Sequence, residues 1–304
     1  MTVLARTVEV TRRYGDVLAL DRVSLDIRAG ELVGLLGPNG AGKSTLINLF
    51  VGLRRPSSGT VELLGGSPSD PVVRRGIGVT PQETGLPEAL RVGEIVDFVS
   101  RHFPGAGAGT KNGAPKNQHK ADLLERFGLT DLVKRQVGGL SGGQKRRVAV
   151  ALAFAGNPRL VFLDEPTTGL DVEARRALWA GIKAFHDDGG TIVLTSHYLE
   201  EIEALAERVV VVARGSVLAD DTVRAVRDMV GVHRVSMTAA ELPELPGVLA
   251  SSVEDGRINL VTSDADRLVV DLVRSGVPFT GLEVRPTSLE EAFLAITAKE
   301  NAHV

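Results

Sequence analysis

The sequence predicts an α/β fold with a central parallel sheet, an antiparallel β part, a helical part and a small C-terminal α+β domain. Three observations predict it. Short continuous apolar runs, such as Leu32–Leu36 and Leu160–Leu163, are typical of strands that are buried on both faces of a parallel sheet. Residues 1–30 alternate apolar and polar side chains, as half-buried antiparallel strands do. The stretch from about residue 87 to 156 has a mostly helical pattern.

Composition bounds the function. A chain of 304 residues is long enough for two hydrophobic cores, and its net charge of −3 does not support a broad nucleic-acid-binding surface. It has no cysteine, so neither a disulfide framework nor a thiolate zinc site is expected. No apolar run approaches the ~20 residues of a membrane helix, and the N-terminus lacks the pattern of a signal peptide. We expect a cytoplasmic protein without a nucleic-acid partner, and any membrane role must come through another chain.

A glycine-rich loop follows the apolar run Leu32–Leu36 and precedes a helical pattern. The pattern G-x-x-x-x-G-K-[ST] is fitted by Gly37, Pro38, Asn39, Gly40, Ala41, Gly42, Lys43, Ser44 and Thr45. The glycines let backbone N–H groups surround phosphates, Lys43 reaches the β and γ oxygens, and the Ser44 hydroxyl is a Mg²⁺ ligand. The sequence therefore predicts a nucleotide site in which Lys43 also takes part in catalysis.

Two adjacent carboxylates end the apolar run Leu160–Leu163, and Pro166 helps to end the strand. The carboxyl ends of the strands are where open α/β sheets bind their ligands. We expect Asp164 to hold Mg²⁺, directly or through water. We expect Glu165 to polarise the attacking water as a general base.

A second glycine pair stands about a hundred residues after the first loop. Leu140–Gln144 contains Ser141, Gly142, Gly143 and Gln144, and it opens a basic and apolar helical run. Its backbone N–H groups suit an anion, as those of the first loop do. From the residues alone, it stays open whether both elements serve the same nucleotide.

Three further polar or aromatic residues have two interpretations each. His197 follows the strand Thr191–Ser196 and either is structural or reaches a γ-phosphate or the attacking water. Gln82 follows the strand-like Ile77–Thr80 and either contacts Mg²⁺ or water or lies on the surface. Tyr14 either stacks on adenine or is an edge-strand aromatic.

The order and spacing of these motifs resemble the ATP-binding subunits of ABC transporters, over residues 1 to about 220. The resemblance rests on Gly37–Thr45, Gln82, Leu140–Gln144, Leu160–Glu165, Gly169–Asp171 and His197. It implies a P-loop NTPase fold and ATP hydrolysis with Glu165 as catalytic base, His197 as switch histidine and Tyr14 as adenine platform. It also implies that Leu140–Gln144 caps the nucleotide of a second subunit and that Asp171 couples the two sites.

Three segments are similar to the daunorubicin-type exporters of that family: Pro166–Asp171, Ser196–Glu201 and Pro286–Leu294. This similarity implies a homodimer, or a dimer with a related ATP-binding subunit, on the cytoplasmic face of the membrane. The dimer would drive a multi-span permease that exports a drug-like, antibiotic-like or lipophilic molecule. Leu90–Glu94 departs from the family's usual Thr-Val-Arg-like run where the subunit faces its membrane partner. The alternatives are an importer subunit, which predicts a β-barrel tail, and a soluble ABC ATPase of DNA repair or translation.

Residues 221–304 predict a small α+β domain, ferredoxin-like in pattern. Its expected elements are a helix near Thr222–Val230, a strand Arg234–Thr238, a hairpin turn at Asp255–Gly256, a helix Ala265–Arg274, a strand Leu282–Val284 and a final helix that begins with a Ser288–Glu291 capping box. No catalytic constellation is visible there, and His233 and His303 are expected to be structural or solvated.

The glycine-rich Pro104–Pro115 predicts a mobile surface loop, with a membrane or nucleic-acid contact as the alternative.

Overall fold

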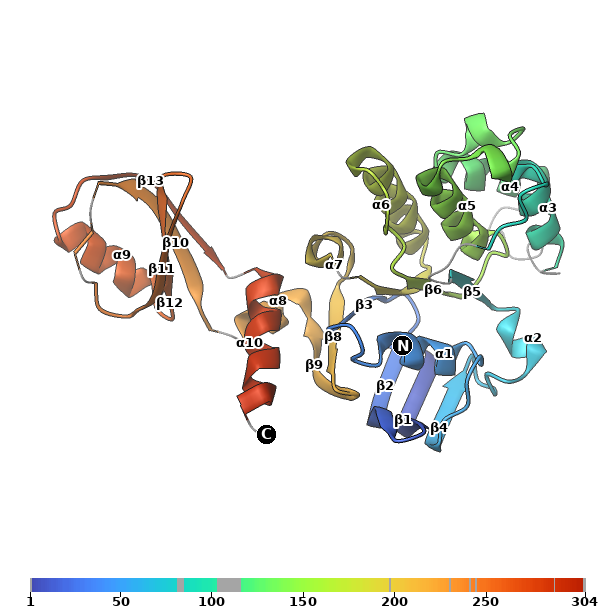
Figure 1. Ribbon diagram of the computed structural model, residues 1–304, viewed down its shortest axis with the longest axis horizontal. Coiled ribbons are helices and arrows are strands. Elements are labelled where there is room, and N and C mark those ends of the chain that lie inside the picture. Colours follow the sequence, from blue (N-terminus) through green and yellow to red (C-terminus); the bar gives the residue numbers. More distant parts are fainter. Residues whose placement is uncertain are drawn as a thin grey trace. The chain divides into compact units, whose positions relative to one another are not determined.

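The computed structural model describes residues 2–80, 85–102, 116–196, 198–229, 231–240, 242–243, 245–286 and 288–302. Gln82, His197, His303 and the glycine-rich loop Pro104–Pro115 lie outside these residues. The chain divides into two compact units, Met1–Asp220 and Asp221–Val304 (Figure 1). Among the helices that the structure describes, none is long and apolar enough to cross a membrane.

A six-stranded sheet forms the centre of the first unit, in the order β5-β6-β7-β3-β8-β9. Its strands are β3 (Leu32–Leu36), β5 (Ile77–Thr80), β6 (Leu160–Asp164), β7 (Thr191–Thr195), β8 (Arg208–Ala213) and β9 (Ser216–Thr222). The neighbours from β5 to β8 pair in parallel. Both β3 and β7 are buried along their whole length, as their continuous apolar runs predict. The carboxyl ends of these parallel strands therefore lie at one edge of the sheet.

A three-stranded antiparallel sheet in the order β2-β1-β4 lies beside it. Its strands are β1 (Val3–Tyr14), β2 (Val17–Arg28) and β4 (Ser58–Leu63). The expectation of antiparallel strands in residues 1–30 is thereby confirmed. The alternating pattern has the physical cause expected of it, because alternate side chains of β2 are buried in the core and exposed to solvent.

The helices of the first unit are α1 (Lys43–Phe50), α2 (Pro71–Arg74), α3 (Val92–Arg101), α4 (Lys116–Arg126), α5 (Gly142–Phe154), α6 (Val172–Asp187) and α7 (Leu199–Leu205). In Figure 1, α5 and α6 lie on one side of the six-stranded sheet, and α1 lies on the other side with the antiparallel strands. The expected helix end at Gly128 is confirmed within two residues, because α4 ends at Arg126 and Gly128 has a φ of +61°.

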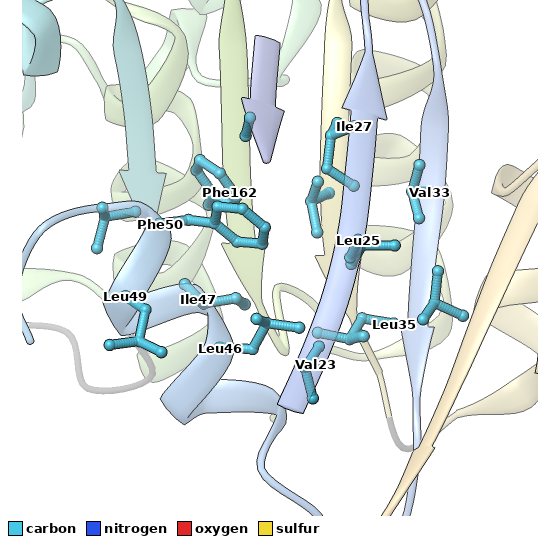
Figure 2. Packing of buried hydrophobic residues seen from close by; sticks show 14 of the residues in the cluster. Val23, Leu25, Ile27, Val33, Leu35, Leu46, Ile47, Leu49, Phe50 and Phe162 are labelled. Atoms are coloured by element: carbon cyan, nitrogen blue, oxygen red, sulfur yellow. The ribbon is translucent and has the colours of Figure 1, made fainter. Parts of the chain in front are cut away.

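The hydrophobic core between the two sheets holds α1 in place. Val23, Leu25 and Ile27 of β2 face Val33 and Leu35 of β3 across this core (Figure 2). Phe50 of α1 stacks on Phe162 of β6, with ring centroids 5.8 Å apart. Each such buried side chain contributes about 1.5–3 kcal/mol to stability. The helix that follows the glycine-rich loop is therefore fixed on a packed base.

The second unit is a four-stranded antiparallel sheet with its own core. Its elements are α8 (Val223–Asp228), β10 (His233–Ala239), β11 (Val248–Glu254), β12 (Arg257–Thr262), α9 (Ala265–Arg274), β13 (Phe279–Pro286) and α10 (Leu289–Ala302). The sheet order is β11-β12-β10-β13. Val235 and Met237 of β10 pack with Leu260, Leu268 and Leu272.

Three sequence predictions in this unit are confirmed. The helix Ala265–Arg274 has the expected bounds. Asp255 and Gly256 both have positive φ, +50° and +75°, as a tight hairpin turn requires. The Ser288–Glu291 capping box is present, with the Glu291 N–H donating to Ser288 Oγ at 3.2 Å and the Ser288 N–H donating to Glu291 Oε2 at 2.9 Å.

Candidate active site

The glycine-rich loop joins β3 to α1 and passes close to two other strands. A Cβ atom at Gly37 would lie 2.1 Å from the Val212 carbonyl oxygen of β8. At Gly42, where φ is +107°, a Cβ would lie 2.5 Å from the Ala19 carbonyl oxygen of β2. Neither position has room for a side chain, so the glycines are required by the packing of the loop.

The start of α1 is suited to an anion. Gly42 caps the helix without a side-chain acceptor, and the first turn contains no acidic residue. The first backbone N–H groups of a helix have no partner within it, so they are left to bind a ligand. The residues present therefore fit a phosphate group.

Lys43 lies over this loop with only 8 % of its surface exposed. Its Nζ donates to the carbonyl oxygens of Gly37 at 2.6 Å and Pro38 at 3.1 Å. Burial lowers the pKa of Lys43, and the negative charges of Glu165 and Asp164 act against that shift. Lys43 and the two strand-end carboxylates therefore lie close enough to interact electrostatically.

Asp164 is oriented by the neighbouring strand. Thr195 of β7 donates its hydroxyl to Asp164 Oδ1 at 2.6 Å, and the same Oγ1 accepts the Glu165 N–H at 3.0 Å. Asp164 stays partly exposed. Its carboxylate and the exposed Ser44 hydroxyl are oxygen ligands of the kind that Mg²⁺ prefers, so the donor set fits that ion.

Glu165 has a backbone conformation that is rare for a residue with a side chain. Its φ is +48°, in the left-handed region. Such strain costs on the order of 1–3 kcal/mol and is found where the surrounding structure holds it. The carboxylate accepts a hydrogen bond from Thr168 Oγ1 at 3.3 Å and is partly exposed.

A buried arginine donates hydrogen bonds to the backbone of this strained segment. Arg146 of α5, 4 % exposed, donates through Nη2 to the carbonyl oxygens of Asp164 at 2.6 Å and Glu165 at 2.8 Å. Its Nε donates to the Pro166 carbonyl oxygen at 3.2 Å. Burial lowers the pKa of Arg146. Sequence reasoning missed this residue, because Arg146 stands between Lys145 and Arg147 and nothing local marks it as the buried one of the three.

Ser141 is the N-cap of α5, and its side chain and that of Gln144 cap one another's backbone N–H groups. Ser141 Oγ accepts the Gln144 N–H at 3.2 Å, and Gln144 Oε1 accepts the Ser141 N–H at 3.0 Å. This capping box leaves the N–H groups of Gly142 and Gly143, at the start of the helix, without a partner inside the helix. The turn is exposed at Ser141 and Gly142, so it is open to an anion from outside the chain.

Tyr14 lies at the end of β1 and is 39 % exposed. The guanidinium carbon of Arg12 is 4.4 Å from its ring centroid, so one face of the ring is covered by a cation. Two further residues that the sequence assigns to the site, Gln82 and His197, lie outside the part of the chain that the structure describes. The strands before them, β5 and β7, end at the same edge of the sheet as β6.

Comparison with known proteins identifies the family. A family model described as ABC transporter matches residues 20–168. Over 98 % of this chain and 94 % of the relative, the sequence is 33 % identical to the doxorubicin resistance ATP-binding protein DrrA of Mycobacterium tuberculosis. The chain belongs to the ABC transporter family, as an ATP-binding subunit. This ABC subunit is also 35 % identical to the daunorubicin resistance ATP-binding protein DrrA2 of Streptomyces coeruleorubidus, over 96 % of this chain and 94 % of the relative. It is 34 % identical to the Nod factor export ATP-binding protein I of Rhizobium sp., over 96 % of both.

Solved structures agree with this assignment. The ABC subunit resembles an ATP-binding subunit of an ABC transporter with a TM-score of 0.67 and 28 % identity, over 75 % of this chain and 93 % of the other. It resembles a dimeric ATP-binding cassette in a post-hydrolysis state, bound to ADP and phosphate, with a TM-score of 0.62 and 28 % identity over 72 % and 98 % of the two chains. The predictions of an ABC ATPase fold and of ATPase activity are confirmed.

Proposed function

We propose that this ABC subunit works as a dimer and powers the export of a lipophilic, drug-like or antibiotic-like small molecule through a separate multi-span permease. The dimer would lie at the cytoplasmic face of the membrane and be held there by the permease. The observation that carries the proposal is near full-length similarity to ATP-binding proteins that are named for doxorubicin resistance, daunorubicin resistance and Nod factor export.

The site residues divide the work of hydrolysis. Lys43 and the N–H groups of the loop hold the phosphates, and Tyr14 offers its free ring face to the adenine. Ser44 and Asp164, with Gln82, hold Mg²⁺, which neutralises charge on the phosphate oxygens when it is bound.

Glu165 accepts the proton of the attacking water, and His197 orients the γ-phosphate or that water. The strained backbone of Glu165 supports its role, because strain of this kind gathers at sites of function. Its partial exposure beside Lys43 leaves the carboxylate accessible to a water molecule.

The turn Ser141–Gln144 supports the proposed dimer. Its side chains cap one another, and the free N–H groups of Gly142 and Gly143 are suited to the nucleotide of a second subunit. Asp171 caps α6 by accepting the Ala174 N–H at 2.8 Å, which fixes the segment that would couple the two sites. The dimeric solved cassettes that resemble this chain support the same arrangement.

An apolar groove in the first unit is the surface that we assign to a cytoplasmic segment of the permease. Its volume is about 410 Å³, and it is lined by Val51, Leu53, Arg74, Ile77, Gly78, Val79, Val99, Leu152, Ala153 and Gly156. Leu53 on its wall is 61 % exposed, and Phe98, next to Val99 on α3, is 60 % exposed. Leu90–Glu94, which the sequence assigns to the membrane-facing side, leads into the same helix.

The second unit, residues 221–304, is proposed to be an accessory domain without chemistry of its own. Within the residues that the structure describes, no group of three His, Asp or Glu side chains is placed to hold a metal ion. The separate core around Met237 supports an independent packing unit.

The test of the hydrolytic site is Glu165→Gln, which keeps the shape of the side chain and removes the base. A general base contributes ~10²–10⁴-fold, so we expect kcat to fall by that factor while ATP binding persists and an ATP-bound dimer accumulates. Glu62→Gln, on the exposed surface of β4, is the matched control. Wild-type hydrolysis by the Glu165 variant would show that another group is the base.

The proposed contact of Ser141–Gln144 with the nucleotide of a second subunit is tested by Ser141→Arg, which places a bulky cation at the start of α5. We expect ATP-driven dimerisation to be lost, as measured by light scattering, while the monomer keeps its affinity for ATP. Equal loss of monomer binding would refute the role of this turn in a second subunit's site.

The permease contact is tested in the apolar groove. Leu53→Glu should abolish co-purification of the permease with the ABC subunit, and Val8→Glu, on the exposed face of β1, should not.

A further inference from the structure

A fully buried carboxylate lies just behind the candidate active site. Glu201 of α7 has no solvent-exposed surface. Thr167 Oγ1 donates to its Oε2 at 3.0 Å, and Trp179 Nε1 donates to its Oε1 at 2.9 Å. Among the roles proposed for hydrolysis, none uses Glu201.

The two donors come from separate parts of the chain. Thr167 belongs to the loop after β6, and Trp179 belongs to α6. Burial raises the pKa of Glu201, and the neighbouring Ser196, Trp179 and Thr167 side chains and the charge of Arg175 act against that rise. A buried carboxylate is retained where its lone pairs are satisfied, so Glu201 joins these two segments to α7.

The first of these segments carries a residue of the site. Thr167 stands two positions after Glu165, whose backbone is strained, and the Thr167 side chain is buried. Arg146 binds carbonyl oxygens of this segment, and Glu201 binds the Thr167 hydroxyl. The strained conformation persists because these contacts hold the segment.

We propose that Glu201 is a positioning residue for ATP hydrolysis, which ties the segment carrying Glu165 to α6 and α7 through its hydrogen bonds with Thr167 and Trp179. The inference rests on the proposed role of Glu165 as the base. It differs from a role in packing alone, because it requires the hydroxyl of Thr167 and the carboxylate of Glu201 to act as a pair.

Four substitutions separate these roles. Glu201→Gln keeps the shape, and its one oxygen can still accept from Trp179, but its NH₂ group forces the Thr167 hydroxyl to accept rather than donate. Thr167→Val removes the donor at nearly constant shape, and Thr167→Ser restores it. Glu200→Gln changes the exposed neighbour on the same helix and is the matched control.

For Glu201→Gln and Thr167→Val we expect kcat to fall about tenfold or more, with KM for ATP within about twofold of wild type, because small misplacements of a catalytic group slow chemistry more than binding. Thr167→Ser and Glu200→Gln should stay near wild type. The double variant should fall no further than the more impaired single variant, since the two residues act as one pair.

Trp179 gives a second readout that does not depend on hydrolysis. It is the only tryptophan of the chain, and its indole N–H is bound to Glu201. We expect ATP to change its emission in the wild type and in Glu165→Gln, because a shift of the Glu165 segment reaches the indole through Thr167 and Glu201. In Thr167→Val the emission change should be lost, although equilibrium dialysis still shows ATP binding.

Wild-type kcat in both Glu201→Gln and Thr167→Val would overturn the proposal. So would a Thr167→Ser variant as impaired as Thr167→Val, because the loss would then come from packing. If Glu201→Gln does not fold, the Thr167 pair carries the test alone. Normal hydrolysis by Glu165→Gln would show that Glu165 is not the base, and the proposed role of Glu201 in hydrolysis would then fail with it. Loss of the emission response only in Thr167→Val would still show that the Thr167–Glu201 hydrogen bond links the Glu165 segment to Trp179.

Discussion

Arg146→Met tests how the strained segment at Glu165 is held. Arg146 donates to the carbonyl oxygens of Asp164, Glu165 and Pro166 at distances of 2.6, 2.8 and 3.2 Å. Methionine fills much of the same space but offers no donor, so all three carbonyl groups lose the guanidinium, and the Glu165 carbonyl keeps only the Thr168 N–H at 3.3 Å. Each unsatisfied buried acceptor costs about 1–3 kcal/mol, and some of the carbonyls will recover a bond to water. We therefore expect the free energy of unfolding to fall by about 3–5 kcal/mol.

The assay is equilibrium unfolding in urea, together with ATP hydrolysis at a temperature where the variant is folded. A loss of about 1 kcal/mol lowers Tm by about 2–4 °C in a domain of this size, so Tm should fall by roughly 6–20 °C. The control is Arg147→Met, the next residue of α5, whose guanidinium makes a long 3.4 Å bond to the Gly128 carbonyl oxygen. If both variants unfold within about 0.5 kcal/mol of one another, the three carbonyl bonds do not hold the segment.

Three further predictions concern other parts of the chain. Gly37→Ala should abolish ATP binding and destabilise the first unit by about 1–3 kcal/mol, because a Cβ would lie 2.1 Å from the Val212 carbonyl oxygen; Gly139→Ala, where no atom lies within 4 Å, should do neither. Arg6 lowers the pKa of Asp26 by a hydrogen bond, so this carboxylate stabilises the fold above its ordinary pKa of about 3.9 and loses that effect as the pH falls through its lower folded pKa. Asp26→Asn should then cost up to about 1 kcal/mol at pH 7 and progressively less as the pH falls below the ordinary pKa of the carboxyl, as measured by urea unfolding at a series of pH values. Ser288→Ala should remove about 1 kcal/mol from the second unit, seen as a lower unfolding midpoint of that unit.

Much of the fold is written in local patterns. The strands β3 and β6 follow from continuous apolar runs, and α9 from helical periodicity between an aspartate cap and a glycine-containing turn. The hairpin at Asp255 follows from a two-residue turn that only a few residue types can form. Each of these signals lies within about ten residues of sequence, so no knowledge of distant partners is needed.

The supports of the site are different, because their partners are distant in sequence. Thr195 donates to Asp164 across 31 residues, and Thr167 donates to Glu201 across 34. A threonine or a glutamate gives no local sign of such a bond. The capping box of Ser141 and Gln144 is a contrasting case, since Ser-x-x-Gln is a local pattern that the interpretation of the turn as an anion-binding element left unused.

Burial and hydrogen-bond partners separate residues that do chemistry from residues that hold them. Asp164 and Glu201 are both carboxylates beside the end of a parallel strand. Asp164 is partly exposed and accepts the Thr195 hydroxyl at 2.6 Å, so it keeps oxygen lone pairs for an ion. Glu201 is fully buried and accepts hydrogen bonds from Thr167 and Trp179, so it is not accessible to a ligand. On the proposed roles, the same functional group would serve as a metal ligand in one place and as a structural anchor in the other, and burial and hydrogen-bond partners tell the two apart.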